Sequence, residues 1–207
     1  MNNEKTIISL FDYSGNWSKP YKQNGYNIIQ VDIKLGIDVF NWYYKKIQNV
    51  YGILAAVPCT DYALCGAKYF KEKDLKGITN NSNKLVNKTK EIIDYFKPNL
   101  KFWVIENPMS RIHKLNPWLG NVKYKFNPCD FAKYDPQPKN SQYNKMTWLW
   151  GDFNNPIPKP LPALITGLKW KDQFTKKDRQ EKRSITPLGF AYAFYHANTI
   201  IWIFRTT

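Results

Sequence analysis

The chain has 207 residues, a formal net charge of +15 at pH 7 and a pI near 9.6. That length is enough for one hydrophobic core of ordinary size but does not hold a second domain's worth of sequence, so a single domain over residues 1–207 is expected. The excess of lysine and arginine favours a polyanionic partner, most simply nucleic acid. A lysine- and asparagine-rich composition inherited from an AT-rich genome is the alternative explanation of the charge.

The cysteine and histidine content narrows the class of protein. The three cysteines are Cys59, Cys65 and Cys129, and none has CxxC spacing; the two histidines, His113 and His196, are far apart. We therefore predict no metal site. An odd number of cysteines in a chain that begins with a strand pattern rather than a signal peptide predicts reduced thiols and the cytoplasm of a bacterial or phage-infected cell. The apolar segment near the C-terminus is interrupted by polar residues, so no membrane span is predicted.

The N-terminal part has the pattern of a strand, a turn and a second strand. An apolar run that starts at Thr6 leads into a turn through Gly15, and residues 16–24 are expected to form a short helix. A second strand over residues 26–31 ends at Asp32. In this βαβ layout the turn approaches a cofactor closely, and the acidic residue that closes the second strand accepts hydrogen bonds from ribose hydroxyls.

A cysteine follows the next apolar run. Residues 51–57 have the composition of a buried strand that breaks at Pro58, so Cys59 should lie just past the carboxyl end of that strand. Ligands bind at this edge in open α/β sheets. We interpret Cys59 as a candidate nucleophile, with a buried structural thiol as the alternative.

The segment after Cys59 is predicted to be a loop followed by a helix and a strand. Residues 62–80 form a charged, glycine-punctuated stretch, which we expect to be a movable loop long enough to cover a site. Apolar residues at helical spacing predict an amphipathic helix over residues 83–96. A strand over residues 101–105 follows, as a right-handed crossover onto a parallel sheet requires, and it leads into Glu106 and Asn107.

The second half of the chain is less regular. Residues 124–135 and 147–151 are predicted to be later strands, partly antiparallel, and residues 154–162 an extended, proline-rich connector. The basic stretch 169–183 either contacts phosphates or is a solvated surface. Residues 187–204 are expected to form an apolar helix that packs against the sheet near the first strand.

Taken together in this order, these segments resemble the C5-cytosine methyltransferases, especially the short, phage-type members. The resemblance covers most of the chain. It is carried by the following residues in their order: Leu10, Phe11 and Gly15; Asp32; Gly36, Ile37 and Asp38; Pro58 and Cys59; Glu106, Asn107 and Pro108; Thr186, Pro187, Gly189, Phe190 and Ala191.

The resemblance implies a fold and a reaction. The fold is α/β, a Rossmann-like S-adenosylmethionine-dependent methyltransferase fold with a mostly parallel central sheet flanked by helices. The reaction is methyl transfer to cytosine C5 in DNA: Cys59 adds to C6, which makes C5 nucleophilic. Glu106 is the acid at N3, and burial beside an apolar strand would raise its pKa as that role requires. Asn107 would hold the loop or the base edge.

The resemblance also implies binding residues. S-adenosyl-L-methionine is the cofactor, with Phe11 against its adenine, Asp12 and Gly15 in the turn, Asp32 at the ribose hydroxyls and Asp38 at the adenine amino group. The alternative for the last two residues is a strand-end cap and a surface turn.

Beside the nucleophile, the resemblance implies that Pro58 touches both the cofactor and the target base. Thr60 and Lys145 are the other residues expected to bind the substrate. No metal is expected in the reaction.

Three departures from the family pattern leave alternatives open. Tyr13 stands where the family usually has glycine, so either the turn differs or the side chain packs outward. A proline-rich and basic insert at about residues 153–184 takes the place of a target-recognition domain. Lys145 is the main basic group where the family has an arginine-rich element. The same chemistry on a free pyrimidine nucleotide, or a catalytically weak nucleic-acid-binding protein, are therefore the alternatives to a DNA methyltransferase.

Overall fold

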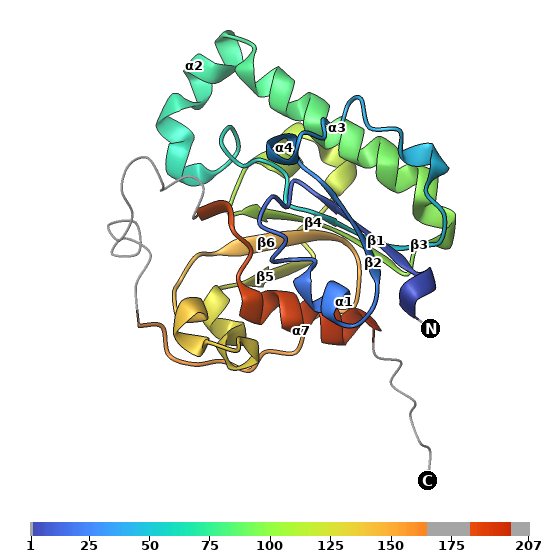
Figure 1. Ribbon diagram of the computed structural model, residues 1–207. Helices are drawn as coiled ribbons and strands as arrows, with labels where there is room; N and C mark the ends of the chain where they lie inside the picture. Colours follow the sequence, from blue (N-terminus) through green and yellow to red (C-terminus); the bar gives the residue numbers. More distant parts are fainter. Residues whose placement is uncertain (1, 165–182, 200–207) are drawn as a thin grey trace.

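The computed structural model describes residues 2–164 and 183–199, and its centre is a six-stranded sheet with the order β2-β1-β3-β4-β6-β5 (Figure 1). The strands are β1 (Thr6–Leu10), β2 (Asn27–Val31), β3 (Val50–Ala55), β4 (Phe102–Pro108), β5 (Tyr124–Phe126) and β6 (Thr147–Asp152). β1 to β4 are parallel, whereas β6 runs antiparallel to both β4 and β5. The expectation of an α/β chain with a mostly parallel central sheet is confirmed.

Helices cover both faces of the sheet. Figure 1 shows α3 across one face and α1 and α7 across the other. The α-helices are α1 (Lys19–Gln23), α2 (Phe70–Leu75), α3 (Ile78–Phe96), α4 (Ile112–Leu115) and α7 (Leu188–Thr199). The 3-10 turns are η1 (Asn2–Glu4), η2 (Ile33–Leu35), η3 (Tyr44–Lys46), η4 (Leu64–Tyr69), η5 (Lys97–Asn99), η6 (Pro117–Leu119), η7 (Pro128–Tyr134) and η8 (Pro138–Ser141).

The central strand β1 is buried along its whole length, and its two faces pack into different cores. In β1, Ile8 packs into the core that contains Val86 and Ile92 of α3. Its neighbour Ile7 packs into the opposite core, which contains Phe190 of α7. Successive side chains of a strand point to opposite faces, so a parallel strand covered on both sides has a continuous apolar run.

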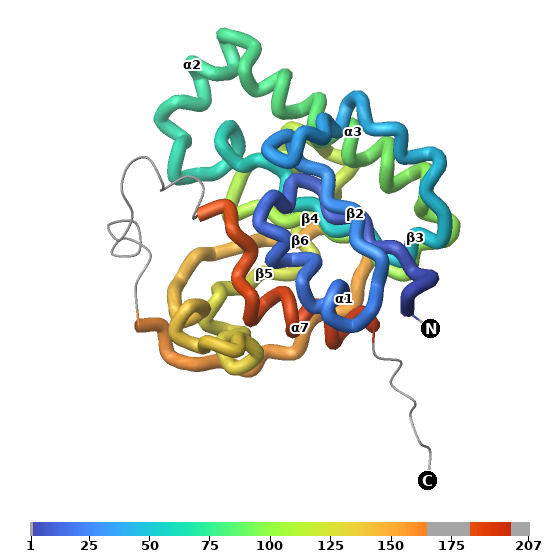
Figure 2. The backbone as a smooth tube through the Cα atoms, viewed as in Figure 1, coloured from blue at the N-terminus to red at the C-terminus, as the bar shows by residue number. Residues whose placement is uncertain are grey.

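The strand order reverses between β1 and β3. From β1 the chain passes through α1 to β2 on one side, then returns past β1 to β3 and continues through α3 to β4 (Figure 2). Val31, Leu10, Ala55 and Ile105 are paired in one row across these strands. The segments that follow the row therefore leave the sheet at one edge, and in open α/β sheets the crevice at such a switch point is where ligands bind.

The predicted movable loop after Cys59 is wrong. Most of residues 62–80 is helical: η4 is followed by α2, and α3 begins at Ile78, five residues before the predicted start. A salt bridge between Arg111 and Asp74, with two N–O distances of 2.7 Å, ties α2 to the segment after β4. Gly77, one of the glycines of this stretch, has φ +70° and is the N-cap of α3.

Two predicted strands end three or more residues away from their predicted ends. The strand expected over residues 101–105 extends to Pro108, because Glu106, Asn107 and Pro108 pair with β6. The strand expected over residues 124–135 ends at Phe126, and the chain then turns into η7. Asn127 and Asp130 form a capping box at the start of η7, and Pro128 occupies the first helical position between them. These signals for a helical turn explain why the strand stops early.

The C-terminal helix packs as expected within its described part. Phe190 and Phe194 of α7 contact Trp17, with ring centroids 5.9 and 6.1 Å apart, and share a core with Ile7 of β1. Of the basic stretch 169–183, residues 169–182 lie outside the described residues. Over the described ranges, no helix combines the length and apolarity needed to cross a membrane.

Candidate active site at the carboxyl edge of the sheet

Cys59 lies in a tight turn beyond β3. The Ala56 N–H still donates to Leu10 O (3.0 Å), so the chain follows the sheet for one residue past the strand. Pro58 and Thr60 are exposed, whereas Cys59 between them is partly buried. The Cys59 carbonyl accepts N–H bonds from both Tyr62 and Ala63, at 3.0 and 2.9 Å. The thiol is therefore presented by a hydrogen-bonded turn at the edge predicted from the sequence.

The neighbouring strand β4 brings Glu106 and Asn107 to the same edge. Asn107 is fully buried, and its Nδ2 donates to Val57 O at 2.9 Å, which fixes the segment leading to Cys59. Its Oδ1 is buried without a hydrogen-bond partner among the described residues. Glu106 is partly buried and pairs with Leu149 of β6. The sequence-predicted pair therefore lies beside the cysteine, with Asn107 holding the loop.

The charges around the thiol act in opposite directions. Burial raises the pKa of Cys59, and the Glu106 carboxylate raises it further, whereas the positive charges of Lys145 and Arg183 lower it. Burial likewise raises the pKa of Glu106, and Lys145 opposes that shift. A carboxyl in such an environment is more easily protonated, and Lys145 is the cation that both groups share.

Lys145 and Arg183 are held against each other. Lys145 Nζ donates to the Arg183 carbonyl at 2.8 Å, and the Arg183 guanidinium lies 3.8 Å from the sulfur of Cys65. Tyr143 is a further neighbour of Glu106. Burial raises the pKa of Tyr143, and the Glu106 charge raises it further. Arg183 was considered only as the last residue of the basic stretch 169–183, and Cys65 and Tyr143 were not predicted as site residues, since no spacing in the sequence links the three to Cys59.

The turn that carries Cys59 is held by a buried aspartate. Asp61 accepts hydrogen bonds from Lys73 of α2 (2.6 Å) and Ser82 of α3 (2.5 Å). Burial works to raise the pKa of Asp61, but these hydrogen bonds outweigh it and leave the pKa below its usual value. Lys73 also donates to the Thr60 carbonyl at 2.9 Å. Side chains of α2 and α3 therefore hold Thr60 and Asp61, the two residues that follow Cys59.

Arg111 completes this clamp from the other side. Its guanidinium donates to Asp61 O at 3.2 Å, pairs with both carboxylate oxygens of Asp74 and stacks 3.7 Å from the Phe70 ring. The Arg111 backbone N–H also donates to Tyr62 O at 3.0 Å. Arg111 thus links the turn after β3, α2 and the segment after β4, and the sequence reasoning missed it.

The turn after β1 is organised by Asp12. Its buried carboxylate accepts hydrogen bonds from the hydroxyls of Ser9 (2.8 Å), Ser14 (3.3 Å) and Ser18 (3.1 Å). Burial raises the pKa of Asp12 in spite of these bonds. The structure therefore places this predicted cofactor residue inside the turn, where it acts on the chain itself.

Two backbone positions shape the same turn. Phe11 has a φ of +59°, unusual for a residue with a side chain, at the point where the chain leaves β1. Gly15 has a φ of +68°, and a Cβ there would lie 3.0 Å from the Gln30 amide. The positive φ therefore favours glycine at position 15, and a side chain there would crowd the Gln30 amide.

Asp32 and Asp38 lie beyond β2 and are held by local bonds. Asp32 Oδ1 accepts from the Lys34 N–H at 2.8 Å and caps η2. Asp38 accepts from the Phe40 N–H (3.0 Å) and from Asn41 Nδ2 (3.2 Å). Each carboxylate has capacity for further hydrogen bonds, since two oxygens offer about four acceptor sites. Capping and ligand binding are thus compatible at these positions.

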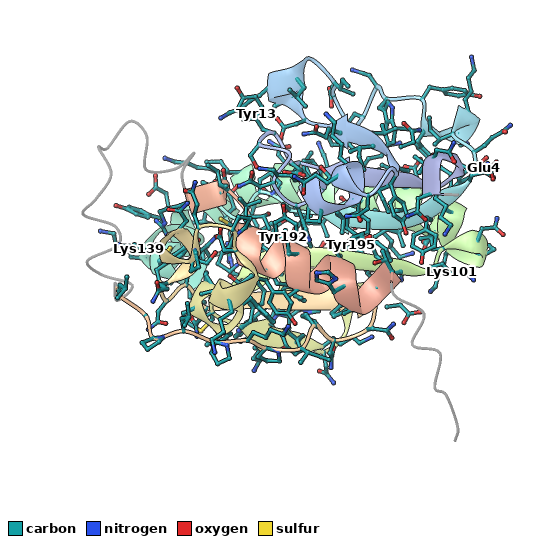
Figure 3. All side chains as sticks on the ribbon, turned by 60° about the horizontal axis from the view of Figure 1, so that its bottom comes forward. Glu4, Tyr13, Lys101, Lys139, Tyr192 and Tyr195 are labelled. Carbon is teal, nitrogen blue, oxygen red and sulfur yellow. The ribbon has the colours of Figure 1, made fainter. Side chains whose placement is uncertain are left out.

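The Tyr13 side chain packs outward. This is one of the two possibilities that follow from a tyrosine in place of the family's usual glycine. Its side chain is 45% exposed, and Lys34 Nζ lies 4.8 Å from the ring centroid (Figure 3). The ring therefore does not fill the inside of the turn.

A polar cavity of about 470 Å³ lies beside the turn after β1. Its lining has lysines, serines and amides but no acidic residue: Ser14, Gly15, Asn16, Ser18, Lys19, Lys22, Gln23 and Gln30. Gly15 is the one predicted cofactor residue among them; Phe11, Asp32 and Asp38 do not line this cavity.

Comparisons with known proteins assign no class to this site, since neither a protein-family model nor a curated protein matches the chain. In the part of the chain that the structure describes, no three histidine, cysteine or acidic residues are grouped so that they could hold a metal ion.

Proposed function

We propose that the chain is an S-adenosyl-L-methionine-dependent DNA cytosine C5 methyltransferase of the Rossmann-like methyltransferase fold, with Cys59 as nucleophile and Glu106 as acid. The observation that carries the proposal is the meeting of Cys59, Glu106 and Lys145 at the carboxyl edge, where Cys59 follows β3, the strand next to β1, and Glu106 lies on β4. A thiol, a carboxyl with a raised pKa and a shared cation are the groups that addition to a pyrimidine ring needs.

The thiol would act on C6 of the base. Attack by a thiolate needs the proton to leave sulfur, and the charges of Lys145 and Arg183 favour that step. Burial of the resting thiol disfavours the free thiolate, so the anion forms most readily when a base covers the turn and accepts the electron pair. The bond from sulfur to C6 moves electron density to C5.

The carboxyl would act on N3 of the same ring. Negative charge develops on the ring during addition, and a protonated Glu106 can deliver its proton to N3. Its raised pKa keeps a larger protonated fraction near neutral pH. The C5 proton then passes to water, the bond from sulfur to C6 breaks as Cys59 leaves as thiolate, and N3 returns its proton to the Glu106 carboxylate, which restores the neutral ring.

The residues of the β1 and β2 ends fit the proposed cofactor. The carboxylates of Asp32 and Asp38 have the acceptor capacity for ribose hydroxyls and an adenine amino group. The turn after β1 has a positive φ at both Phe11 and Gly15, and this backbone conformation shapes the edge where the cofactor is proposed to bind. S-adenosyl-L-methionine, when bound, supplies the methyl group that C5 accepts.

The same chemistry on a free pyrimidine nucleotide is the second candidate. The observation that favours it is the connector after β6, which is hydrogen-bonded to the body of the chain through residue 164. Lys133 N–H donates to Lys159 O, Leu161 N–H to Cys129 O and Leu164 N–H to Gln142 O. That part of the insert forms no separate lobe for reading a base sequence.

Three measurements test the proposal. DNA of cells that produce the chain should gain 5-methylcytosine in nucleoside mass analysis, and cells that produce Cys59→Ala should not. Purified protein should transfer labelled methyl groups to duplex DNA faster than to cytidine monophosphate. Duplex DNA with 5-fluorocytosine should give a covalent adduct that depends on Cys59. No transfer to DNA combined with transfer to the nucleotide would select the second candidate, and no transfer to either would overturn both.

A further inference from the structure

Three large apolar side chains are exposed on segments that lie at the same edge of the sheet as the turn of Cys59. Leu64, Met109 and Met146 have exposed fractions of 42%, 43% and 40%. They come from three segments that are joined by backbone hydrogen bonds: the Leu64 N–H donates to Met109 O, and the Met109 N–H donates to Met146 O, both at 3.1 Å. We refer to these three residues as the apolar rim.

The apolar rim is built into the candidate site. Leu64 follows the turn in which Cys59 O accepts the Tyr62 and Ala63 N–H groups. Met109 comes three residues after Glu106, and Met146 directly follows Lys145. The backbone that presents the rim is therefore the same backbone that presents the thiol, the carboxyl and the shared cation.

Basic side chains lie near the rim, in addition to the Glu106 carboxyl. Lys145 and Arg183 lie next to it, and exposed Lys68 stacks on Tyr69 in η4, with Nζ 4.9 Å from the ring centroid. An exposed apolar patch framed by cations suits a ligand that carries flat apolar faces on an anionic backbone, which is the chemistry of a nucleic-acid strand. Because the same backbone carries the proposed nucleophile, a nucleic-acid substrate fits this patch better than an acidic, apolar protein partner.

We propose that the apolar rim binds the nucleobases next to the target cytosine and replaces the stacking that those bases lose when the target leaves the helix. This inference rests on the proposed function and names the residues that would open the duplex. Apolar side chains that insert between base steps partly unstack them, and contact with a base face depends little on base identity. The rim therefore supplies affinity and base extrusion without a recognition sequence.

The test compares affinity for two DNA duplexes with two protein variants, all in the Cys59→Ala background and without cofactor. One duplex has normal bases on both sides of the target cytosine, and the other has abasic sites there. The rim variant carries Leu64→Asn, Met109→Gln and Met146→Gln, which keep size and replace apolar by polar groups. Ile157→Asn is the matched control, because Ile157 is 57% exposed and lies in the connector after β6.

The rim variant should lose about 5- to 100-fold in affinity for the normal duplex and less than about twofold for the abasic duplex. In the parental protein, 2-aminopurine placed next to the target should brighten on binding, and the rim variant should remove this signal. The Ile157 control should match its parent in all measurements.

Equal losses on both duplexes would mean that the rim does not touch bases, and would overturn this inference while leaving the methyltransferase proposal standing. Absence of DNA binding by the unsubstituted chain would overturn both. A circular dichroism melt of the rim variant separates loss of contact from loss of fold.

Discussion

The two ends of the candidate site are built differently. The turn of Cys59 is held by side chains from distant parts of the chain: Asn107 of β4, Lys73 of α2, Ser82 of α3 and Arg111. Asp32 and Asp38 instead accept bonds from residues at most three positions away. The difference teaches that the turn of Cys59 is preorganised by tertiary structure, whereas Asp32 and Asp38, which are proposed for the cofactor, depend on local turns.

The largest effect is expected for the nucleophile. Cys59→Ala should reduce methyl transfer to background and leave cofactor affinity and melting temperature near those of the unsubstituted chain, because the thiol acts only on the base. Transfer is measured with labelled cofactor, and Cys129→Ala and Cys65→Ala serve as controls that should remain active. Normal turnover by Cys59→Ala would refute a covalent mechanism.

Next in size is the proposed acid. Glu106→Gln keeps the shape of the side chain and can donate a hydrogen bond, but it cannot deliver a proton, so the rate should fall by roughly 10²–10⁴ with little change in DNA affinity. Single-turnover kinetics measure the rate, and a binding titration measures the affinity. An unchanged rate would remove Glu106 from the chemistry.

The clamp on the Cys59 turn should matter less than the reacting groups. Arg111→Ala removes the bonds to Asp61 and Asp74 and should lower kcat by about 10- to 100-fold through misplacement of the thiol, with KM for cofactor unchanged. Lys76→Ala, which breaks the exposed Lys76–Glu72 pair on α2, is the control and should have no effect. If both variants behave alike, the clamp is only a surface feature.

A smaller effect on activity is expected at Asp32, whose carboxylate is held by a local hydrogen bond. Asp32→Asn should weaken cofactor binding by about tenfold, since a charged acceptor for ribose hydroxyls becomes a neutral amide, and the rate at saturating cofactor should stay close to normal. Calorimetry measures the binding, and Asp94→Asn on the surface of α3 is the control. Unchanged affinity would favour the capping role of Asp32 alone.

The smallest effect is a pH dependence of the clamp. Hydrogen bonds from Arg111 lower the pKa of Asp74 to about 2, and those on Asp61 also lower its pKa. Folding lowers both pKa values, so their stabilising contribution is complete above the ordinary carboxyl pKa near 4 and is lost as the pH falls towards 2. The difference in melting temperature between the unsubstituted chain and Asp74→Asn should therefore be constant above about pH 5 and shrink below pH 4. A difference that persists to pH 2 would contradict this assignment.

The sequence predicted the part of the fold that depends on local pattern. The apolar runs of β1 and β3 and the helical spacing in α3 are periodic, and the breaks at Pro58 and Gly15 are single-residue signals. These signals placed Cys59, Glu106 and Asn107 at one edge correctly.

The parts that were missed depend on contacts between distant residues. Arg111 meets Asp61 and Asp74 across 50 and 37 positions, and no periodicity marks such a pair. Because this contact cannot be read from the sequence, the glycines and charges of residues 62–80 led to the prediction of a loop where the structure has α2. The capping box of Asn127 is a local signal that could have ended β5 correctly.

The reversed direction of β6 determines when the site can be completed during synthesis. Parallel strands deliver their last residues to the carboxyl edge, whereas an antiparallel neighbour delivers its first, which is why Lys145 arrives there from the segment before Thr147. A nascent chain that has emerged only as far as β4 already holds the thiol and the carboxyl but has no cation beside them. The cations that lower the pKa of Cys59 both come from the second half of the chain, so the proposed activation of this thiol requires that half to fold onto the first.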